Sequence, residues 1–128
     1  MPWAFEQSTG TLYTPAGTPF AIGYAGAQPH VNDPSAQDIP NVGPIPAGDW
    51  AIGAPVDNPE STGPFSLPLT PIPPTQDYGR SGFFVHGDSI QYAGLQRGSD
   101  GCIVLPLWAR KAIWNSADHS LSVVASLS

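Results

Sequence analysis

The 128-residue chain has a single cysteine and few charged residues. One thiol cannot form an intrachain disulfide, which excludes a disulfide-stapled fold. Only 11% of the residues are charged, well below the roughly 25% of ordinary globular domains. Four cations against ten acids leave a net charge of −6, so the chain has no basic surface for a phosphate backbone. We therefore expect no binding to nucleic acid, and repulsion from anionic lipid surfaces.

A long apolar run is also absent. No stretch approaches the roughly 20 apolar residues that a membrane-spanning helix requires. Residues 1–6 have neither the basic start nor the apolar centre of a signal peptide. We therefore expect no membrane span, and we expect synthesis in the cytoplasm without a signal peptide.

Proline and glycine, by contrast, are abundant, with 16 and 14 residues. Together they approach the roughly 25–30% level of low-complexity chains. A hydrophobic fraction of 41% and an aromatic fraction of 10% nevertheless argue against disorder. The chain is long enough for one domain and too short for two. We predict a single compact, loop-rich, mostly-β domain over residues 1–128.

The first half of the chain predicts short strands separated by turns. Strands are expected at residues 3–7, 11–14, 20–24 and 49–53. The first two flank Ser8-Thr9-Gly10 as a hairpin, and residues 28–41 form a polar loop with several prolines. Residues 58–75 hold six prolines. Because proline cannot donate to a sheet ladder, we expect any strand there to lie at a sheet edge.

The second half is more regular. A β-prone run at residues 82–86 ends at His86, and a second short strand at residues 102–105 begins at Cys102. Residues 88–98 connect them, with room for one helical turn. Pro106 suits the first position of a short helix over residues 107–115. A final strand is expected at residues 121–127, so the predicted fold has one or two short helices.

The single thiol, Cys102, lies in the segment Ser99-Asp100-Gly101-Cys102-Ile103. Gly101 lets the backbone adopt unusual dihedral angles, and the amides of Gly101 and Cys102 are candidates for an oxyanion hole. A thiol becomes a strong nucleophile once a neighbouring base or positive charge favours the thiolate. The alternative is that Cys102 packs in the core as a small apolar residue.

A histidine–glycine pair, His86-Gly87, precedes Cys102 by sixteen positions. Histidine is the side chain best suited to act as a general base near neutral pH. The alternative is a histidine that is hydrogen-bonded at a strand end, because spacing alone does not bring His86 and Cys102 together. One cysteine and three scattered histidines lack the spacing of zinc ligands, so we expect no metal site.

Two of the four cations flank these candidates. Arg80 precedes the histidine by six residues, and Arg97 precedes the cysteine by five. A guanidinium at such a site can bind a substrate carboxylate or support a thiolate. Asp88 and Asp100 are candidates to orient an imidazole. Solvated loop arginines and ordinary turn chemistry explain the same residues equally well.

The motif residues resemble a known family over nearly the whole chain. Residues 84–88 (FVHGD) and 98–103 (GSDGCI) resemble the signature of the YkuD-like L,D-transpeptidase superfamily, a His-Gly pair followed by Ser/Thr-His-Gly-Cys. Residues 23–26 (GYAG) and 43–50 (GPIPAGDW) resemble a small branch of that superfamily. Members of the branch are antibacterial effectors delivered by type VI secretion into the periplasm of competing cells.

This resemblance implies a β-sandwich-like YkuD-type fold and a role for individual residues. Cys102 would be the nucleophile and His86 its general base, while Ser99 and Gly101 would shape the turn around the nucleophile. The implied reaction is attack of the thiolate on the third residue of a peptidoglycan stem tetrapeptide. D-Ala leaves, and water or an amine then resolves the thioester on Cys102 (L,D-carboxypeptidase, or L,D-transpeptidase with D-amino-acid exchange).

Two positions depart from the pattern of the superfamily. Asp100 replaces the second histidine of the signature, and Val104 stands where many members have arginine. Arg80 or Arg97 would then supply the missing positive charge, with Tyr24 and Asp100 as further substrate contacts. The resemblance also implies that no cofactor is needed. It further implies three partners: peptidoglycan stem peptides, a cognate immunity protein and a component of the secretion machine. Delivery to the periplasm of target bacteria would follow.

Two other readings stay open. In a papain-like cysteine peptidase or amidase the cysteine precedes the histidine and opens a helix, whereas here the order is reversed. A non-catalytic cell-wall-binding module would use exposed tryptophans as ligand platforms, although tryptophans more often fill a core. The four candidates for that role are Trp3, Trp50, Trp108 and Trp114.

Overall fold

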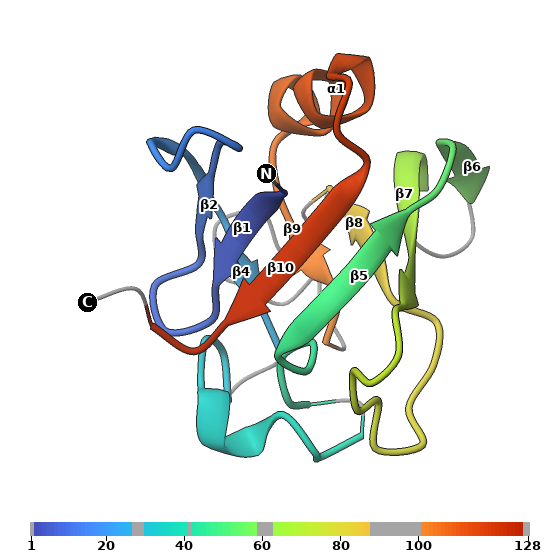
Figure 1. The fold of residues 1–128 in the computed structure, drawn as a ribbon. Helices are drawn as coiled ribbons and strands as arrows, with labels where there is room; N and C mark the ends of the chain where they lie inside the picture. The colour runs from blue at the N-terminus through green and yellow to red at the C-terminus, as the bar shows by residue number, and fades with distance from the viewer. Residues whose placement is uncertain (1, 27–29, 41, 59–62, 88–100, 127–128) are drawn as a thin grey trace.

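The computed structural model (Figure 1) describes residues 2–26, 30–40, 42–58, 63–87 and 101–126. Its strands are β1 (Trp3–Glu6), β2 (Thr11–Tyr13), β3 (Pro19–Ile22), β4 (Tyr24–Ala25), β5 (Gly48–Ile52), β6 (Val56–Asn58), β7 (Gly63–Pro71), β8 (Phe84–His86), β9 (Ile103–Val104) and β10 (Ser120–Val124). The described ranges also contain a 3-10 turn, η1 (Pro34–Ala36), and one helix, α1 (Leu107–Asn115). The predicted mostly-β fold class is confirmed.

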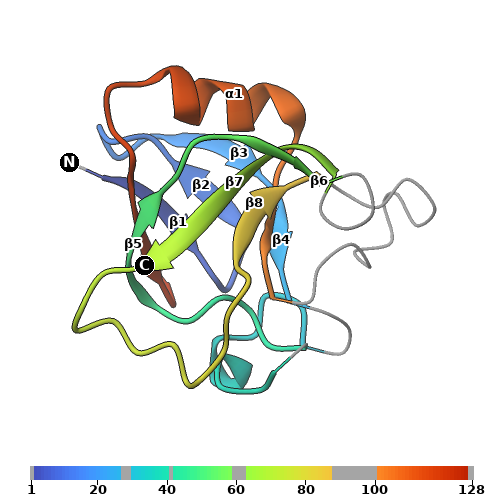
Figure 2. The ribbon, with the colours of Figure 1, turned by 90° about the vertical axis from the view of Figure 1, so that its right-hand side faces the viewer.

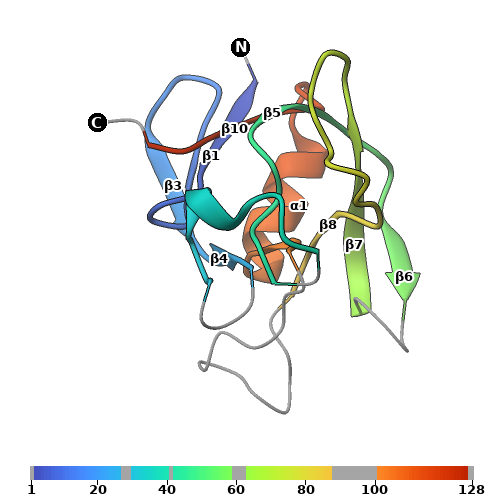
Figure 3. The same ribbon diagram turned by 90° about the horizontal axis from the view of Figure 1, so that it is seen from below.

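The strands form one curved sheet. Its order is β3-β2-β1-β10-β5-β7-β8-β9-β4, with β6 paired to β7. The neighbours β1 and β10, and β8 and β9, run parallel, whereas the other pairs are antiparallel. Figure 2 shows α1 lying across one end of the strands. In the view from below (Figure 3) the strands surround a centre, and α1 is seen at its far end.

Gly23 joins β3 and β4, the two strands at the opposite ends of the sheet order. Strand β3 ends at Ile22 and β4 begins at Tyr24, so the chain crosses from one edge of the sheet to the other within one residue. Gly23 N donates to Gly10 O at 2.8 Å. A Cβ at Gly23 would collide with the carbonyl of Val104. Glycine at this position therefore lets β4 lie against β9, where the candidate site is found.

Alternation along the strands fills the inside of the curved sheet with large apolar side chains. In β5, Trp50 is completely buried and its Nε1 donates to Pro46 O at 3.0 Å. The Trp50 ring lies 5.2 Å from the ring of Phe83 in an edge-to-face arrangement. Burial of such residues removes several hundred Å² of apolar surface from water and supplies most of the stabilisation. Of the candidate platform tryptophans, Trp3 and Trp50 are buried, whereas Trp108 is 56% exposed.

Local sequence patterns predict most of these elements correctly. The hairpin of β1 and β2 around residues 8–10 is confirmed, as are the short strands β5, β8 and β9 and the helix α1. The last strand is shorter than expected, because β10 ends at Val124 and Ala125 is exposed. Pro106 caps α1 rather than forming its first residue. The connection at residues 88–98 lies outside the described residues.

Strand β7 corrects the expectation that the proline-rich segment lies at a sheet edge. It pairs with β5 on one side and with β8 on the other. Leu69 N donates to Phe83 O at 2.9 Å, whereas Pro68 contributes its carbonyl, which accepts from Gly53 N at 2.8 Å. Pro68 has no N–H that could donate to β5 in return. This missing bond would lie just beyond Ile52, the last residue of β5, where the pairing of the two strands ends.

Helix α1 covers one end of the strands (Figure 2), where it packs against β7 and β8. Its buried residues are Ala109, Arg110 and Ile113. Ala109 and Ile113 belong to the hydrophobic core, whereas Arg110 brings a charge to the same face. Within the described residues no helix combines the length and the apolar character that crossing a membrane would require.

Candidate active site

The parallel strands β8 and β9 bring the two predicted catalytic segments side by side. Val85 pairs with Ile103, and His86 pairs with Val104. Val85 and Ile103 belong to the buried core, and successive residues of a strand point to opposite faces of a sheet. His86 and Val104 therefore share the face that is turned away from the core. Cys102 lies one residue before β9, and its place in the site is given by the contacts of its sulfur.

The sulfur of Cys102 lies beside the start of β8. Phe84 N donates to Sγ at 3.3 Å, and Sγ donates to Gly82 O at 3.4 Å. Cys102 as a whole is 8% exposed. The thiol is thus buried but is surrounded by backbone polar groups as well as apolar side chains. A hydrogen bond donated to sulfur favours the thiolate, because it stabilises the charged form.

The residue before the cysteine must be glycine in this arrangement. Gly101 has φ of +127°, which side chains rarely tolerate. A Cβ at this position would collide with Nη2 of Arg80 and would lie 2.9 Å from Gly43 O. The close approach of the Arg80 guanidinium to the backbone beside Cys102 therefore depends on Gly101.

Arg80 is buried and joins the site to the loop before β5. Its Nη1 donates to Gln37 O at 2.6 Å and to Pro44 O at 3.0 Å, and its Nη2 donates to Gly43 O at 2.8 Å. The guanidinium carbon lies 4.9 Å from the ring centre of Phe83. These four contacts are typical of an arginine that fixes the shape of a site rather than one that moves freely in solvent.

The charge of Arg80 interacts with the thiol. Burial lowers the pKa of Arg80, while the negative charges of Cys102 and Asp38 raise the pKa and partly offset that effect. The attraction is mutual, so the guanidinium stabilises a thiolate at Cys102. Sequence reasoning named Arg80 as a cation of the site, but it did not foresee the three carbonyls that hold the guanidinium.

His86 is oriented by the backbone of the residue that follows it. Its Nδ1 lies 2.8 Å from Gly87 O, and its own carbonyl accepts from Leu105 N at 3.0 Å. Because a carbonyl oxygen can only accept, this contact fits the neutral tautomer that is protonated on Nδ1. Nε2 then carries a lone pair, as a general base requires. The sequence offered Asp88 and Asp100 as orienting groups and gave no signal for a carbonyl.

The remaining predicted site residues divide into two groups. Tyr24 is described: it lies on β4, is buried, and pairs with Val104, which puts it on the same face of the sheet as His86. The others, Arg97, Ser99 and Asp100, lie outside the described residues, so their roles stay predictions.

One functional candidate was missed by the sequence reasoning. Arg110 of α1 is 6% exposed, and its guanidinium lies against Gly87, the residue after His86. The sequence does indicate that Arg110 is unusual. It stands three residues before Ile113, on the apolar face of a short helix, where a charged residue is rare.

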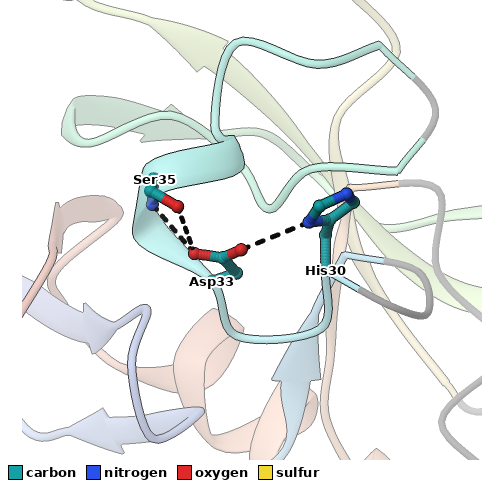
Figure 4. A network of polar contacts seen from close by, with 3 residues as sticks. All are labelled: His30, Asp33 and Ser35. Carbon is teal, nitrogen blue, oxygen red and sulfur yellow. Dashed lines mark hydrogen bonds and ion pairs between the residues drawn. The ribbon is translucent and has the colours of Figure 1, made fainter.

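A network of polar contacts braces the loop that supplies carbonyls to Arg80 (Figure 4). Asp33 Oδ2 lies 3.2 Å from Nδ1 of His30, and Asp33 Oδ1 accepts from Ser35 N at 3.1 Å and from Ser35 Oγ at 2.6 Å. The bonds from Ser35, followed by that from His30, lower the pKa of Asp33. The network precedes Gln37 by a few residues and thereby supports the loop whose carbonyls bind Arg80.

The polar groups that the structure describes around the site include several that can bind an anion. Among the described residues, no three His, Cys, Asp or Glu side chains gather in a way that could hold a metal ion. The polar groups near Cys102 and His86 are backbone amides and carbonyls together with guanidinium groups. The amides and the guanidinium groups among them can stabilise thiolates, oxyanions and carboxylates.

A family model described as the Tlde1 domain matches residues 20–126 of the chain. The matched range runs from β3 to the residues just after β10, and it includes Arg80, His86, Gly101, Cys102 and Arg110. No curated protein and no solved structure matches the chain.

Proposed function

Because the chain belongs to the Tlde1 domain family, a family of type VI secretion L,D-transpeptidase effectors, we propose that it is a peptidoglycan-targeting cysteine acyltransferase that acts on stem tetrapeptides. The observation that carries the proposal is the register of β8 and β9. Continued by one residue, that register would put Cys102 opposite Phe84 and two positions from the partner of His86. Diagonal neighbours in antiparallel pairs have Cα atoms about 7–8 Å apart, and we infer a similar separation here, which a thiol and an imidazole together can bridge.

The proposed reaction begins with proton transfer from Cys102 Sγ to Nε2 of His86. The thiolate attacks the carbonyl carbon of the third stem residue and forms a tetrahedral oxyanion. As this intermediate collapses, the C–N bond to D-Ala breaks, and His86 gives its proton to the leaving amine. The products of this half-reaction are free D-Ala and a thioester on Cys102.

Water or an amine then resolves the thioester. His86 accepts a proton from the attacking group, the C–S bond breaks, and the thiol is regenerated with a tripeptide or an exchanged stem as product. Water gives L,D-carboxypeptidase activity, and a D-amino acid or a second stem gives exchange or L,D-transpeptidase activity. The backbone amides of Gly101 and Cys102 are the proposed oxyanion donors, and Ser99 is the proposed neighbour in the nucleophile turn.

Two contacts support activation of the thiol. The guanidinium of Arg80 lies against the backbone at Gly101 and stabilises negative charge at Cys102. The N–H of Phe84 donates to Sγ. In the resting state the thiol proton points to Gly82 O, and loss of that proton removes the bond to this carbonyl. Arg80 is therefore proposed as a positioning and electrostatic residue, whereas Tyr24, Arg97 and Asp100 remain proposed substrate contacts.

Family membership also supports proposals about delivery and partners. We infer that the protein reaches the periplasm of target bacteria through the type VI machine, in contact with a component of that machine, and that the producing cell protects itself with a cognate immunity protein. The domain that carries this activity is proposed to extend over residues 1–128.

The test of this function is a digest of tetrapeptide muropeptides with purified protein, analysed by mass spectrometry. We expect loss of D-Ala from the stems, or exchange of D-Ala when another D-amino acid is added, and we expect a thiol reagent to block both. Folded protein with a free thiol that leaves the muropeptides unchanged would overturn the proposal. Cleavage of a different bond in the stem would favour a cysteine peptidase or amidase of another class.

One observation favours a second function, a cell-wall-binding module. Trp108 is 56% exposed, and its ring packs edge-to-face on Phe20 at 5.4 Å between ring centres. An aromatic side chain held in this way can act as a ligand platform. The Cys102→Ala variant separates the two functions, because a binding module keeps its effect on target cells and an acyltransferase loses it.

A further inference from the structure

We propose that Arg110 binds the terminal carboxylate of the residue that leaves in the first half-reaction, and so selects stems that end at that residue. The inference rests on the function proposed above and adds a substrate-binding residue to it. It starts from a charge in the interior of the protein: Arg110 is 6% exposed, although arginine is rarely buried without a partner.

Two of the three guanidinium nitrogens of Arg110 have partners that hold the fold together. Nε donates to Leu105 O at 3.1 Å, at the end of β9. Nη1 donates to Pro64 O at 2.8 Å and to Phe65 O at 3.1 Å, at the start of β7. All three acceptors are neutral carbonyls, so these bonds satisfy donors but leave the positive charge without a counter-charge among the described residues.

The third nitrogen, Nη2, points to the end of β8. A Cβ at Gly87 would lie 2.9 Å from Nη2 of Arg110, so the guanidinium packs directly against the backbone of that residue. Nη2 has no hydrogen-bond acceptor among the described residues. This contact explains why the residue after His86 is glycine, since any side chain at position 87 would displace Nη2 of Arg110.

The two buried arginines of the site differ in what surrounds their charges. Burial lowers the pKa of both, but only at Arg80 do negative groups, Cys102 and Asp38, raise the pKa in return. Desolvation acts alone at Arg110. A buried cation of this kind gains most from an anion that arrives with a ligand, because the pair then forms in a region of low dielectric constant.

The chemistry of the proposed reaction indicates which anion that is. His86 must hand its proton to the leaving amine, so the leaving residue lies beside the imidazole. In a tetrapeptide stem the carboxylate of this residue is two bonds from its amine. Arg110 lies behind the residue that follows His86, at the opposite end of β8 from Arg80 and Cys102. A stem that ends in an amide, or that continues by one more residue, would offer no carboxylate there.

The experiment compares two substrates that differ only at this group: a stem tetrapeptide with a free terminal carboxylate and its terminal carboxamide. Release of the terminal residue is followed by mass spectrometry, and kcat/KM is measured for both substrates with each enzyme. We expect the wild-type protein to prefer the acid by about 10- to 100-fold, the range for a charge-assisted hydrogen bond. We expect Arg110→Gln to lose this preference, because turnover of the acid falls by more than turnover of the amide.

The ratio between the two substrates within one variant does not depend on how much of the protein is folded. If Arg110 only clamped α1 to β7, its loss would lower both activities together and leave the ratio unchanged. Gly87→Ala provides a second variant, in which a methyl group displaces Nη2 while Arg110 keeps its other bonds; we expect a smaller ratio there as well. Lys111→Gln is the matched control, since it removes an exposed cation from the next position of α1, and we expect it to keep the wild-type ratio.

The outcomes separate this inference from the function on which it rests. Wild-type protein that cleaves acid and amide equally well, or an Arg110→Gln protein that keeps the preference for the acid, overturns the role of Arg110 and leaves the acyltransferase in place. Folded wild-type protein that cleaves neither substrate overturns the acyltransferase, and the role of Arg110 falls with it.

Discussion

Replacing Arg80 with methionine removes a buried cation that joins the loop before β5 to the residue beside the thiol. The guanidinium donates three hydrogen bonds, to Gln37 O, Pro44 O and Gly43 O, at 2.6 to 3.0 Å. A hydrogen bond from a charged donor contributes about 1.5–3 kcal/mol. The three bonds share one side chain and are not independent, and the carbonyls that remain regain some bonds to water. We therefore expect the free energy of unfolding to fall by about 3–5 kcal/mol.

The same substitution should slow the chemistry of the thiol. Arg80 lies against Gly101 and its charge interacts with Cys102. Loss of a nearby positive charge disfavours the thiolate by about 1.4 kcal/mol or more, a tenfold effect. We expect the rate of alkylation by iodoacetamide at pH 7 to fall about tenfold in Arg80→Met, with smaller effects on both properties in Arg80→Lys, which keeps the charge.

Two measurements check this prediction. Urea unfolding followed by tryptophan fluorescence gives the free energy, and Trp50, in contact with Phe83 next to Arg80, makes the signal sensitive to this region. Alkylation is followed by intact mass under conditions where each variant is folded. Lys111→Met is the matched control, because Lys111 is an exposed cation. A loss of less than about 1 kcal/mol, together with an unchanged alkylation rate, would refute the reasoning.

Other predictions address the remaining parts of the site. Gly101→Ala forces a side chain into a φ of +127° and against Arg80; we expect a loss of about 2 kcal/mol or more in unfolding free energy, and equal stability with wild type would contradict the close approach. Cys102→Ala should keep the cooperative unfolding transition but release no D-Ala, so residual release would point to another nucleophile. The hydrogen bonds of Asp33 lower its pKa, so its contribution to stability is present above pH about 4 and is lost at lower pH. The difference in melting temperature between wild type and Asp33→Asn should therefore shrink as the pH falls below that value, and a constant difference would argue against the network.

The sequence predicts those parts of the fold that depend on neighbouring residues. The turn at residues 8–10 is local, and so are the β-prone run before His86 and the helix after Pro106, and all three are present. The position of β7 depends on its partners instead. Its prolines suggest an edge strand, but Pro68 is tolerated inside the sheet because the neighbouring strand ends opposite it.

The candidate site shows the same division. The segments around His86 and Cys102 could be recognised from their residues, but the parallel pairing that sets them side by side is a contact between distant parts of the chain. The imidazole is oriented by the backbone carbonyl of Gly87, and every residue has such a carbonyl, so no residue type in the sequence indicates this contact. Arg110 could have been noticed on the apolar face of its helix, yet its approach to Gly87 requires the packing of α1 on the sheet.

The central claim, acyl transfer through the one thiol, is tested most directly by trapping the acyl-enzyme. Wild-type protein is mixed with a stem tetrapeptide, quenched in acid, and examined by intact-mass and peptide-level mass spectrometry. The account predicts an adduct equal to the tetrapeptide minus D-Ala, located on Cys102 and absent from Cys102→Ala. Release of D-Ala by the Cys102→Ala protein at the wild-type rate, or an adduct on another residue, would contradict it.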